Sequence, residues 1–168
     1  MSDLYVLNKE KDHFITEEDL EKSLYFGFII SYVQGLSQLK VASDEFNYNL
    51  NLESICKIWR GGCIIRADLL ELLMKGLKDD SNIMNLLQSK SITKIISECE
   101  PSVRKVCKYA INFSIPFMGI SSTLSYFNAF KTKNLPSNLI QAQRDYFGEH
   151  TYERIDKEGF FHTEWEKK

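Results

Sequence analysis

The stretch "LYFGFIISYVQGL", Leu24 to Leu36, decides the fold class because its apolar residues recur at helical spacing and cover most sides of the segment. Just upstream, Thr16 and Asp19 have the spacing of a capping box, in which two side chains cap each other's backbone N–H groups at the start of a helix. The apolar positions continue to about Phe46. We therefore predict one long helix from Thr16 to about Phe46.

Small residues form a stripe within this helix. Gly27, Ser31 and Gly35 follow one another at intervals of four, so they lie on one helical face. Glycine costs about 1 kcal/mol relative to alanine inside a helix, and two of them on one face favour a close approach by another backbone. We expect this stripe to face another helix.

The rest of the chain is predicted to be helical up to its C-terminal tail. A second long helix is expected from about Asn51 to Lys78, with Gly61 and Gly62 marking a close approach or a bend. Shorter helices are expected at Ile83–Gln88, Ile92–Cys99, Pro101–Phe113 and Ser121–Lys131, and one after Pro136 that stops at Gly148 as a C′ glycine.

The closing segment "TYERIDKEGFFHTEW" has a turn-like "DKEG" and reads as extended chain or a loose ribbon. Strands do not alternate with helices, and the sequence contains no glycine-rich dinucleotide turn. The predicted fold class is therefore all-α, with a helical body over residues 1–148 and an extended tail over residues 149–168.

Composition excludes several classes of function. The 168 residues carry 21 basic and 23 acidic side chains, a net charge of -2, which gives no electrostatic footprint for nucleic acid. The N-terminus lacks a leading apolar run and the longest apolar stretch is too short for a bilayer, so no membrane role and a cytoplasmic location are expected. The four cysteines and three histidines of the chain do not have zinc-ligand spacing. We therefore expect that the protein binds no metal and that its thiols are reduced.

A polar cluster near the C-terminus is the candidate site. In "LIQAQRDYFGEHTYER", Leu139 to Arg154, Arg144 and His150 lie six positions apart. Arg144 is either a last-turn cation favoured by the helix dipole or a planar fork for a phosphate or carboxylate. His150 is either a loop residue in solvent or packing, or a ligand-binding imidazole. The sequence leaves both alternatives open.

The tail is also rich in aromatic residues, which include Tyr152, Phe160, Phe161 and Trp165. A terminal segment that exposed this much aromatic surface would promote aggregation. We expect it to dock on its own body or on a second chain.

These segments resemble a known family. "SLYFGFIISYVQG", "KIWRGGCIIR" and "LPSNLIQAQRDYFGEHTYERIDKEGFFHTEW" are similar to the C-terminal all-helical domain of 6-phosphogluconate dehydrogenase, and the resemblance runs from about Leu20 to Trp165. It implies an NADP-dependent cytosolic enzyme of the pentose phosphate pathway, which oxidises and decarboxylates 6-phosphogluconate to ribulose 5-phosphate. In that family the nucleotide-binding domain, the lysine base and the glutamate acid lie upstream of the matching segment, so the resemblance implies a C-terminal fragment without catalytic residues.

The same resemblance assigns roles to the polar cluster. The family works as a homodimer whose tail crosses into the partner's active site, where the arginine and histidine of a "QRDYFGxH" motif hold the substrate. These positions match Arg144 and His150, whereas Glu149 replaces the small residue usual before the histidine. The rival hypothesis is a free-standing helical dimerisation module in which Arg144 and His150 serve only packing.

Overall fold

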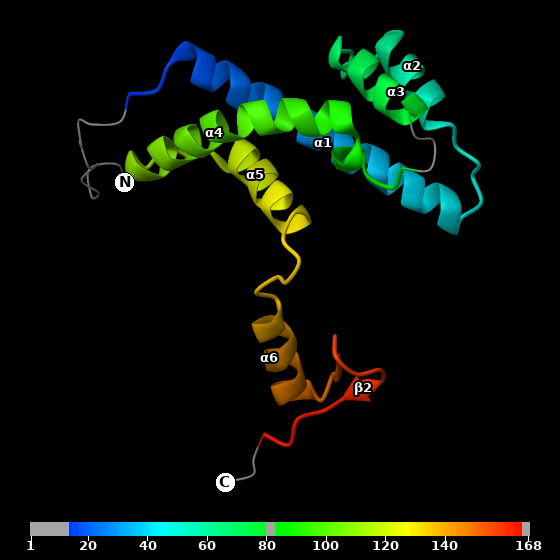
Figure 1. Cartoon of the computed structure of the whole chain (residues 1–168), viewed down its shortest axis with the longest axis vertical. Coiled ribbons are helices and arrows are strands. Elements are labelled where there is room, and N and C mark those ends of the chain that lie inside the picture. The colour runs from blue at the N-terminus through cyan, green and yellow to red at the C-terminus, as the bar shows by residue number, and fades with distance from the viewer. Residues whose placement is uncertain (1–13, 80–82, 166–168) are drawn as a thin grey trace. The chain divides into compact units, whose positions relative to one another are not determined.

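The computed structural model describes residues 14–79 and 83–165, and the helical prediction is confirmed over this part of the chain (Figure 1). In chain order the elements are α1 (Glu17–Glu45), α2 (Leu52–Arg60), α3 (Leu69–Asp79), the 3₁₀ helix η2 (Leu86–Gln88), α4 (Lys90–Asn112), α5 (Met118–Phe130), α6 (Asn138–Gly148), β1 (Tyr152–Glu153) and β2 (Phe160–Phe161).

The chain divides into two compact units, one over residues 1–127 and one over residues 128–168. This division falls before α6, whereas the sequence suggested a boundary after it, at Gly148. The structure therefore groups α6 with the tail. A separate role for residues 149–168 stays a prediction.

The start of α1 is fixed by the predicted capping box. The Asp19 N–H donates to the Thr16 hydroxyl oxygen (3.1 Å), and the Thr16 N–H donates to an Asp19 carboxylate oxygen (3.0 Å). The same carboxylate accepts from the Lys105 ammonium (2.6 Å) and the Ser102 hydroxyl (3.0 Å) of α4. The lysine bond is the largest of the causes that hold the pKa of Asp19 well below its usual range. The cap therefore also ties α1 to α4.

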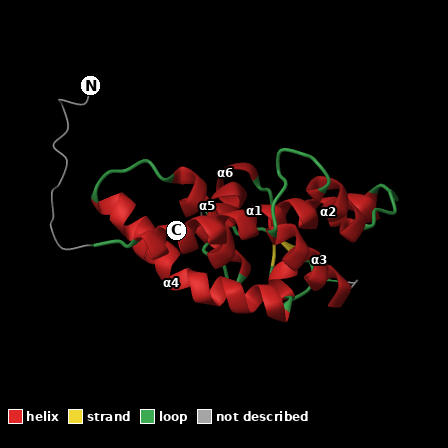
Figure 2. Ribbon diagram, turned by 90° about the horizontal axis from the view of Figure 1, so that it is seen from above, coloured by secondary structure: helices red, strands yellow, loops and turns green. Residues whose placement is uncertain are grey.

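Helices α1 and α4 form the centre of the first unit, and Figure 2 shows α4 from above. Their facing sides bury apolar residues completely, and α3 adds further ones; the cluster includes Phe26, Ile29, Ile30, Val33, Leu70, Leu73, Ile92, Ile96 and Val103. Each such side chain stabilises the fold by roughly 1.5–3 kcal/mol relative to exposure to water. The buried apolar residues of α1 lie between Phe26 and Leu36, in the middle of the helix.

The small-residue stripe of α1 meets another helix at one end only. A Cβ on Gly27 would lie 2.5 Å from the Ile120 Cδ1 atom, so the absence of a side chain lets α5 pack there. Ser31 is exposed, and a Cβ on Gly35 would have no neighbour within 4 Å. The prediction was right for Gly27 and wrong, within the described chain, for the rest of the stripe.

Several predicted helix boundaries were wrong. The segment expected as one helix over Asn51–Lys78 is two, α2 and α3, because the chain turns at Gly61 and Gly62, and Gly62 has a φ of 152° that side chains rarely adopt. Only η2 forms in the segment predicted as Ile83–Gln88. Conversely, the helices expected at Ile92–Cys99 and Pro101–Phe113 are one helix, α4, with Pro101 inside it. Burial of α4 residues on both sides of Pro101 outweighs the lost hydrogen bond.

The second unit consists of α6 and a short antiparallel ribbon. Tyr152 pairs with Phe161 and Glu153 with Phe160, so the prediction of a loose ribbon around the "DKEG" turn is confirmed. The ribbon contacts α6 through β1. Docking of the tail on its own chain is therefore seen for this segment.

Candidate functional site

Asp145, on the last turn of α6, organises the second unit. Its side chain is fully buried and accepts four hydrogen bonds. One oxygen accepts from the Thr151 N–H (3.1 Å) and contacts His162 Nδ1 (2.9 Å). The other accepts from the Thr163 N–H and the Trp165 indole N–H, both at 3.0 Å. One carboxylate thus anchors both the loop after α6 and the end of the tail.

These hydrogen bonds shift the pKa values of Asp145 and His162. Burial raises the pKa of the Asp145 carboxyl, but the hydrogen bonds from Thr163, His162 and Trp165 outweigh burial and lower the pKa to about 2. The bond to Asp145 in turn raises the pKa of His162 above its usual value. Asp145 is therefore an anion at neutral pH.

The loop that carries His150 has an unusual backbone. Glu149 and Thr151, on either side of His150, have left-handed φ values of 49° and 56°. The helix was expected to stop because Gly148 would take the left-handed position, and this was wrong: Gly148 is the last residue of α6 and Glu149 is the left-handed cap. The glycine has another role, since a Cβ on Gly148 would lie 2.8 Å from His150 Cδ2. A side chain at position 148 would therefore force the imidazole to move from this position.

Arg144 and His150 are both exposed. Arg144 lies in α6 just before its last turn, so the expected last-turn cation is not seen, and His150 lies in the loop that follows. The imidazole is supported by an edge contact with the Phe147 ring, at 6.2 Å between centroids. In the described chain no acidic side chain forms an ion pair with Arg144. The guanidinium is thus available to an anionic ligand.

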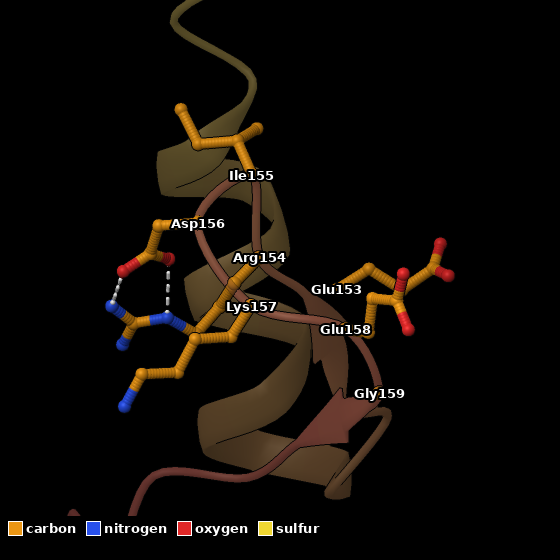
Figure 3. A pocket seen from close by; sticks show the side chains of 7 residues that line it. All are labelled: Glu153, Arg154, Ile155, Asp156, Lys157, Glu158 and Gly159. Atoms are coloured by element: carbon orange, nitrogen blue, oxygen red, sulfur yellow. Dashed lines mark hydrogen bonds and ion pairs between the residues drawn. The ribbon is translucent and has the colours of Figure 1, made fainter.

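A second arginine of the same unit is not available in this way. Arg154 donates two hydrogen bonds to the Asp156 carboxylate, from Nε at 2.7 Å and from an Nη at 2.6 Å, and this pair lies in the turn between β1 and β2 (Figure 3). The turn encloses a shallow hollow lined by residues 153–159. Because its arginine is already paired and two glutamates border it, this hollow is a poor site for an anion.

A larger groove of about 750 Å³ lies in the second unit, between the first half of α6 and the ribbon. Its lining mixes apolar, polar and charged side chains, among them Leu135, Gln141, Tyr152 and Trp165. Neither Arg144 nor His150 lines it. The groove is therefore separate from Arg144 and His150, the substrate-binding residues that the sequence predicts.

Sequence reasoning missed Asp145 and Gln141 as structural partners of the site. A signal for Asp145 was present, because an acidic residue in the last turn of a helix is disfavoured by the helix dipole and needs a compensating partner. Gln141 gave no such signal, since its contact with the backbone of Thr151 depends on how the loop folds back.

Within residues 14–79 and 83–165, no group of three His, Cys, Asp or Glu side chains is arranged to hold a metal ion. The full sequence lacks the glycine-rich turn that cradles a dinucleotide pyrophosphate, so these residues do not fit NADP as its main binding site. No helix in the described chain is long and apolar enough to cross a membrane.

Comparisons with known proteins agree with this architecture. The sequence profile described as "6-phosphogluconate dehydrogenase, C-terminal domain" matches residues 2–165. The decarboxylating 6-phosphogluconate dehydrogenase of Buchnera aphidicola is 46% identical over 94% of this chain, and that of Salmonella typhimurium is 47% identical over 93%.

A solved structure of Plasmodium falciparum 6-phosphogluconate dehydrogenase superposes with a TM-score of 0.84 and 42% identity over 94% of the chain. That enzyme is described without ligands, with its cofactor NADP+ and with its substrate 6-phosphogluconate. The chain spans about one third of the length of each of these relatives: 33% of the two bacterial proteins and 35% of the Plasmodium chain. With a matching profile over almost all its residues, the chain belongs to the family of the 6-phosphogluconate dehydrogenase C-terminal domain.

Proposed function

We propose that this chain is the C-terminal portion of an NADP-dependent 6-phosphogluconate dehydrogenase, a cytoplasmic enzyme that oxidises and decarboxylates 6-phosphogluconate to ribulose 5-phosphate. In this proposal the chain supplies a dimer scaffold and two substrate-binding residues, Arg144 and His150. The lysine base, the glutamate acid and most of the NADP site belong to the remainder of the enzyme. The chain by itself is inactive.

The observation that carries the proposal is the contrast between Arg144 and Arg154. Two arginines lie in one small unit, and only Arg154 has its fork filled by a carboxylate. Arg144 presents a planar fork for two parallel hydrogen bonds to a phosphate, and His150 in the loop after α6 adds an imidazole. Binding energy from a remote phosphate helps to position the carbons that react. The role of the pair is recognition, with proton transfer left to other groups.

The proposal that the pair acts across a homodimer rests on exposed apolar surface. On α6, Leu139 is 77% exposed and Phe147 is 67% exposed, and Ile140 and Tyr146 are exposed as well. A small unit with this much apolar surface is suited to burial against a second subunit. We propose that α6 and the tail enter the partner subunit and deliver Arg144 and His150 there.

The test is kinetic, in a full-length 6-phosphogluconate dehydrogenase that carries this segment. Arg144→Ala removes charge-assisted hydrogen bonds of about 1.5–3 kcal/mol, so KM for 6-phosphogluconate rises roughly 10- to 100-fold while KM for NADP is nearly unchanged. Arg144→Lys restores part of this, because an ammonium keeps the charge and loses the fork. Arg154→Ala is the matched control and leaves KM for 6-phosphogluconate unchanged. If Arg144→Ala also leaves it unchanged, the rival reading as a packing module stands.

Delivery across the dimer is tested by mixing subunits. One subunit carries Arg144→Ala and the other lacks the upstream catalytic lysine. After confirmed subunit exchange, half of the heterodimer sites combine both intact parts, so activity returns. Exchange without recovered activity would place Arg144 in the site of its own subunit or outside any site.

A further inference from the structure

The backbone around His150 is held from both sides by two residues of α6. The Glu149 N–H donates to the Asp145 backbone carbonyl (3.0 Å), and the Thr151 N–H donates to the Asp145 side chain (3.1 Å). The Gln141 amide donates to the Thr151 carbonyl (2.5 Å). Both peptide groups that flank the His150 loop are thus tied to α6.

These bonds stabilise a backbone that local preferences disfavour. Left-handed φ values are strained for residues that carry a Cβ atom. Glu149 and Thr151 both adopt such values, and only His150 separates them. Neither is glycine, and neither is the asparagine that most readily tolerates this conformation. Without tertiary hydrogen bonds the loop would relax, and the direction of the imidazole would change with it.

The place of Asp145 in the chain strengthens this reading. Asp145 directly follows Arg144 in the chain, and its side chain bonds to the loop that carries His150. It therefore connects the positions of the arginine and of the loop. Its carboxylate is fully buried, has all four of its bonds directed at the loop and the tail, and faces no solvent. It is therefore placed to fix geometry, and it does not touch a ligand.

We infer that Asp145 and Gln141 are positioning residues for 6-phosphogluconate binding, which hold the Glu149–Thr151 loop in its strained form so that His150 faces the substrate together with Arg144. The inference rests on the proposed function, because it needs His150 to contact the substrate. The Asp145 side chain holds the Thr151 N–H and three groups of the tail, whereas the Gln141 side chain acts only at the Thr151 carbonyl. Asp145 therefore has the larger effect.

The experiment is a double-mutant cycle in a full-length 6-phosphogluconate dehydrogenase that carries this segment. Asp145→Asn replaces one carboxylate oxygen with an amide N–H₂ group, which cannot accept the two hydrogen bonds that this oxygen accepts. Gln141→Met keeps the length of the side chain but removes the N–H that bonds to the Thr151 carbonyl. We expect KM for 6-phosphogluconate to rise roughly 10- to 100-fold for Asp145→Asn and less for Gln141→Met, with KM for NADP unchanged in both. Since Gln141→Met leaves the Asp145 anchor intact, it keeps the test valid if Asp145→Asn loosens the whole tail.

Two controls and one background decide the outcome. Asp156→Asn makes the same charge change in the same unit, and Gln143→Met makes the same side-chain change on an exposed position of α6; both leave KM unchanged. In a His150→Ala background the effect of Gln141→Met disappears, because a residue that acts through His150 has nothing left to position.

Two results overturn the inference and leave the proposed function intact. In the first, His150→Ala raises KM for 6-phosphogluconate and Gln141→Met does not. In the second, the double variant shows the full sum of the two single effects on the free energy of binding. If both Arg144→Ala and His150→Ala leave KM unchanged, the proposed function fails and the inference fails with it.

Discussion

The two compact units of this chain are held together in different ways. In the first unit, apolar side chains of α1, α3 and α4 bury one another, and the polar contacts of Asp19 lie at the margin. In the described part of the second unit, residues 128–165, the one fully buried side chain is the carboxylate of Asp145. Apolar packing tolerates small changes of shape, whereas a buried anion needs each of its donors in place. The second unit is therefore organised by direction-specific bonds, which suits a segment that presents two side chains to a ligand.

The largest effect on stability is expected in the apolar core. Phe26 is fully buried and makes an edge contact with Phe127 at 5.6 Å between ring centroids. Phe26→Ala should lower the free energy of unfolding by about 3–5 kcal/mol, because it removes a large buried ring and leaves a cavity. Urea denaturation of the chain followed by circular dichroism measures this.

Phe28 is the matched control, since it lies on the same helix and is 53% exposed. Phe28→Ala should cost less than about 1 kcal/mol. Equal losses for the two variants would mean that α1 does not bury the face described here.

A second prediction concerns pH and the second unit. The pKa of Asp145 is lowered to about 2 from 3.8, so its contribution is present above 3.8 and is lost as the pH falls through about 2. The pKa of His162 is raised from 6.5, so its contribution is full below 6.5 and is lost as the pH rises through the raised value. Glu149 and Glu164 also favour protonated His162. Docking of the tail should be tightest between about pH 4 and 6.5.

The indole N–H resonance of Trp165 reports this directly, because that group donates to Asp145, and Trp59 in the first unit serves as the internal reference. His162→Gln should remove the change on the alkaline side and keep the change on the acid side. A resonance of Trp165 that ignores pH across both ranges would contradict the assignment.

The smallest effect tests the unfilled part of the small-residue stripe. Gly35→Ala should raise the free energy of unfolding by about 0.5–1 kcal/mol, since a Cβ there meets no atom and alanine favours the helix. Gly62→Ala should act in the opposite direction, because the φ of 152° at Gly62 is strained for any side chain. Thermal unfolding of both variants decides this. Destabilisation by Gly35→Ala would mean that another backbone does approach the stripe in solution.

Sequence patterns predicted the parts of the fold that depend on local chemistry. The capping box of Thr16 and Asp19 and the apolar periodicity of α1 specify a helix and its first residue without reference to the rest of the chain. The break at Gly61 and Gly62 and the continuity of α4 through Pro101 were mispredicted, because both depend on which neighbouring surfaces are buried. Local preference allows a bend or a straight path at such residues, and tertiary packing selects between them.

The candidate site divides in the same way. Arg144 and His150 were found because their residue types and spacing resemble a family motif, and their exposure in the structure agrees with a binding role that stays a proposal. Asp145 and Gln141 were missed because their partners lie up to 20 residues along the chain and are mostly backbone groups, which carry no sequence signal. The last-turn position of Asp145 indicated that it needs a partner, but only the fold identifies the donors that surround it.

The claim that one carboxylate organises the second unit is tested most directly by amide hydrogen exchange in Asp145→Asn, compared with Asp156→Asn as the charge-matched control. The account predicts that the amides of Thr151 and Thr163 lose protection in Asp145→Asn and keep it in Asp156→Asn, while the core amides of α1 and α4 exchange as before in both. Unchanged protection at Thr151 and Thr163 in Asp145→Asn, or a loss that spreads equally through α1 and α4, would contradict it.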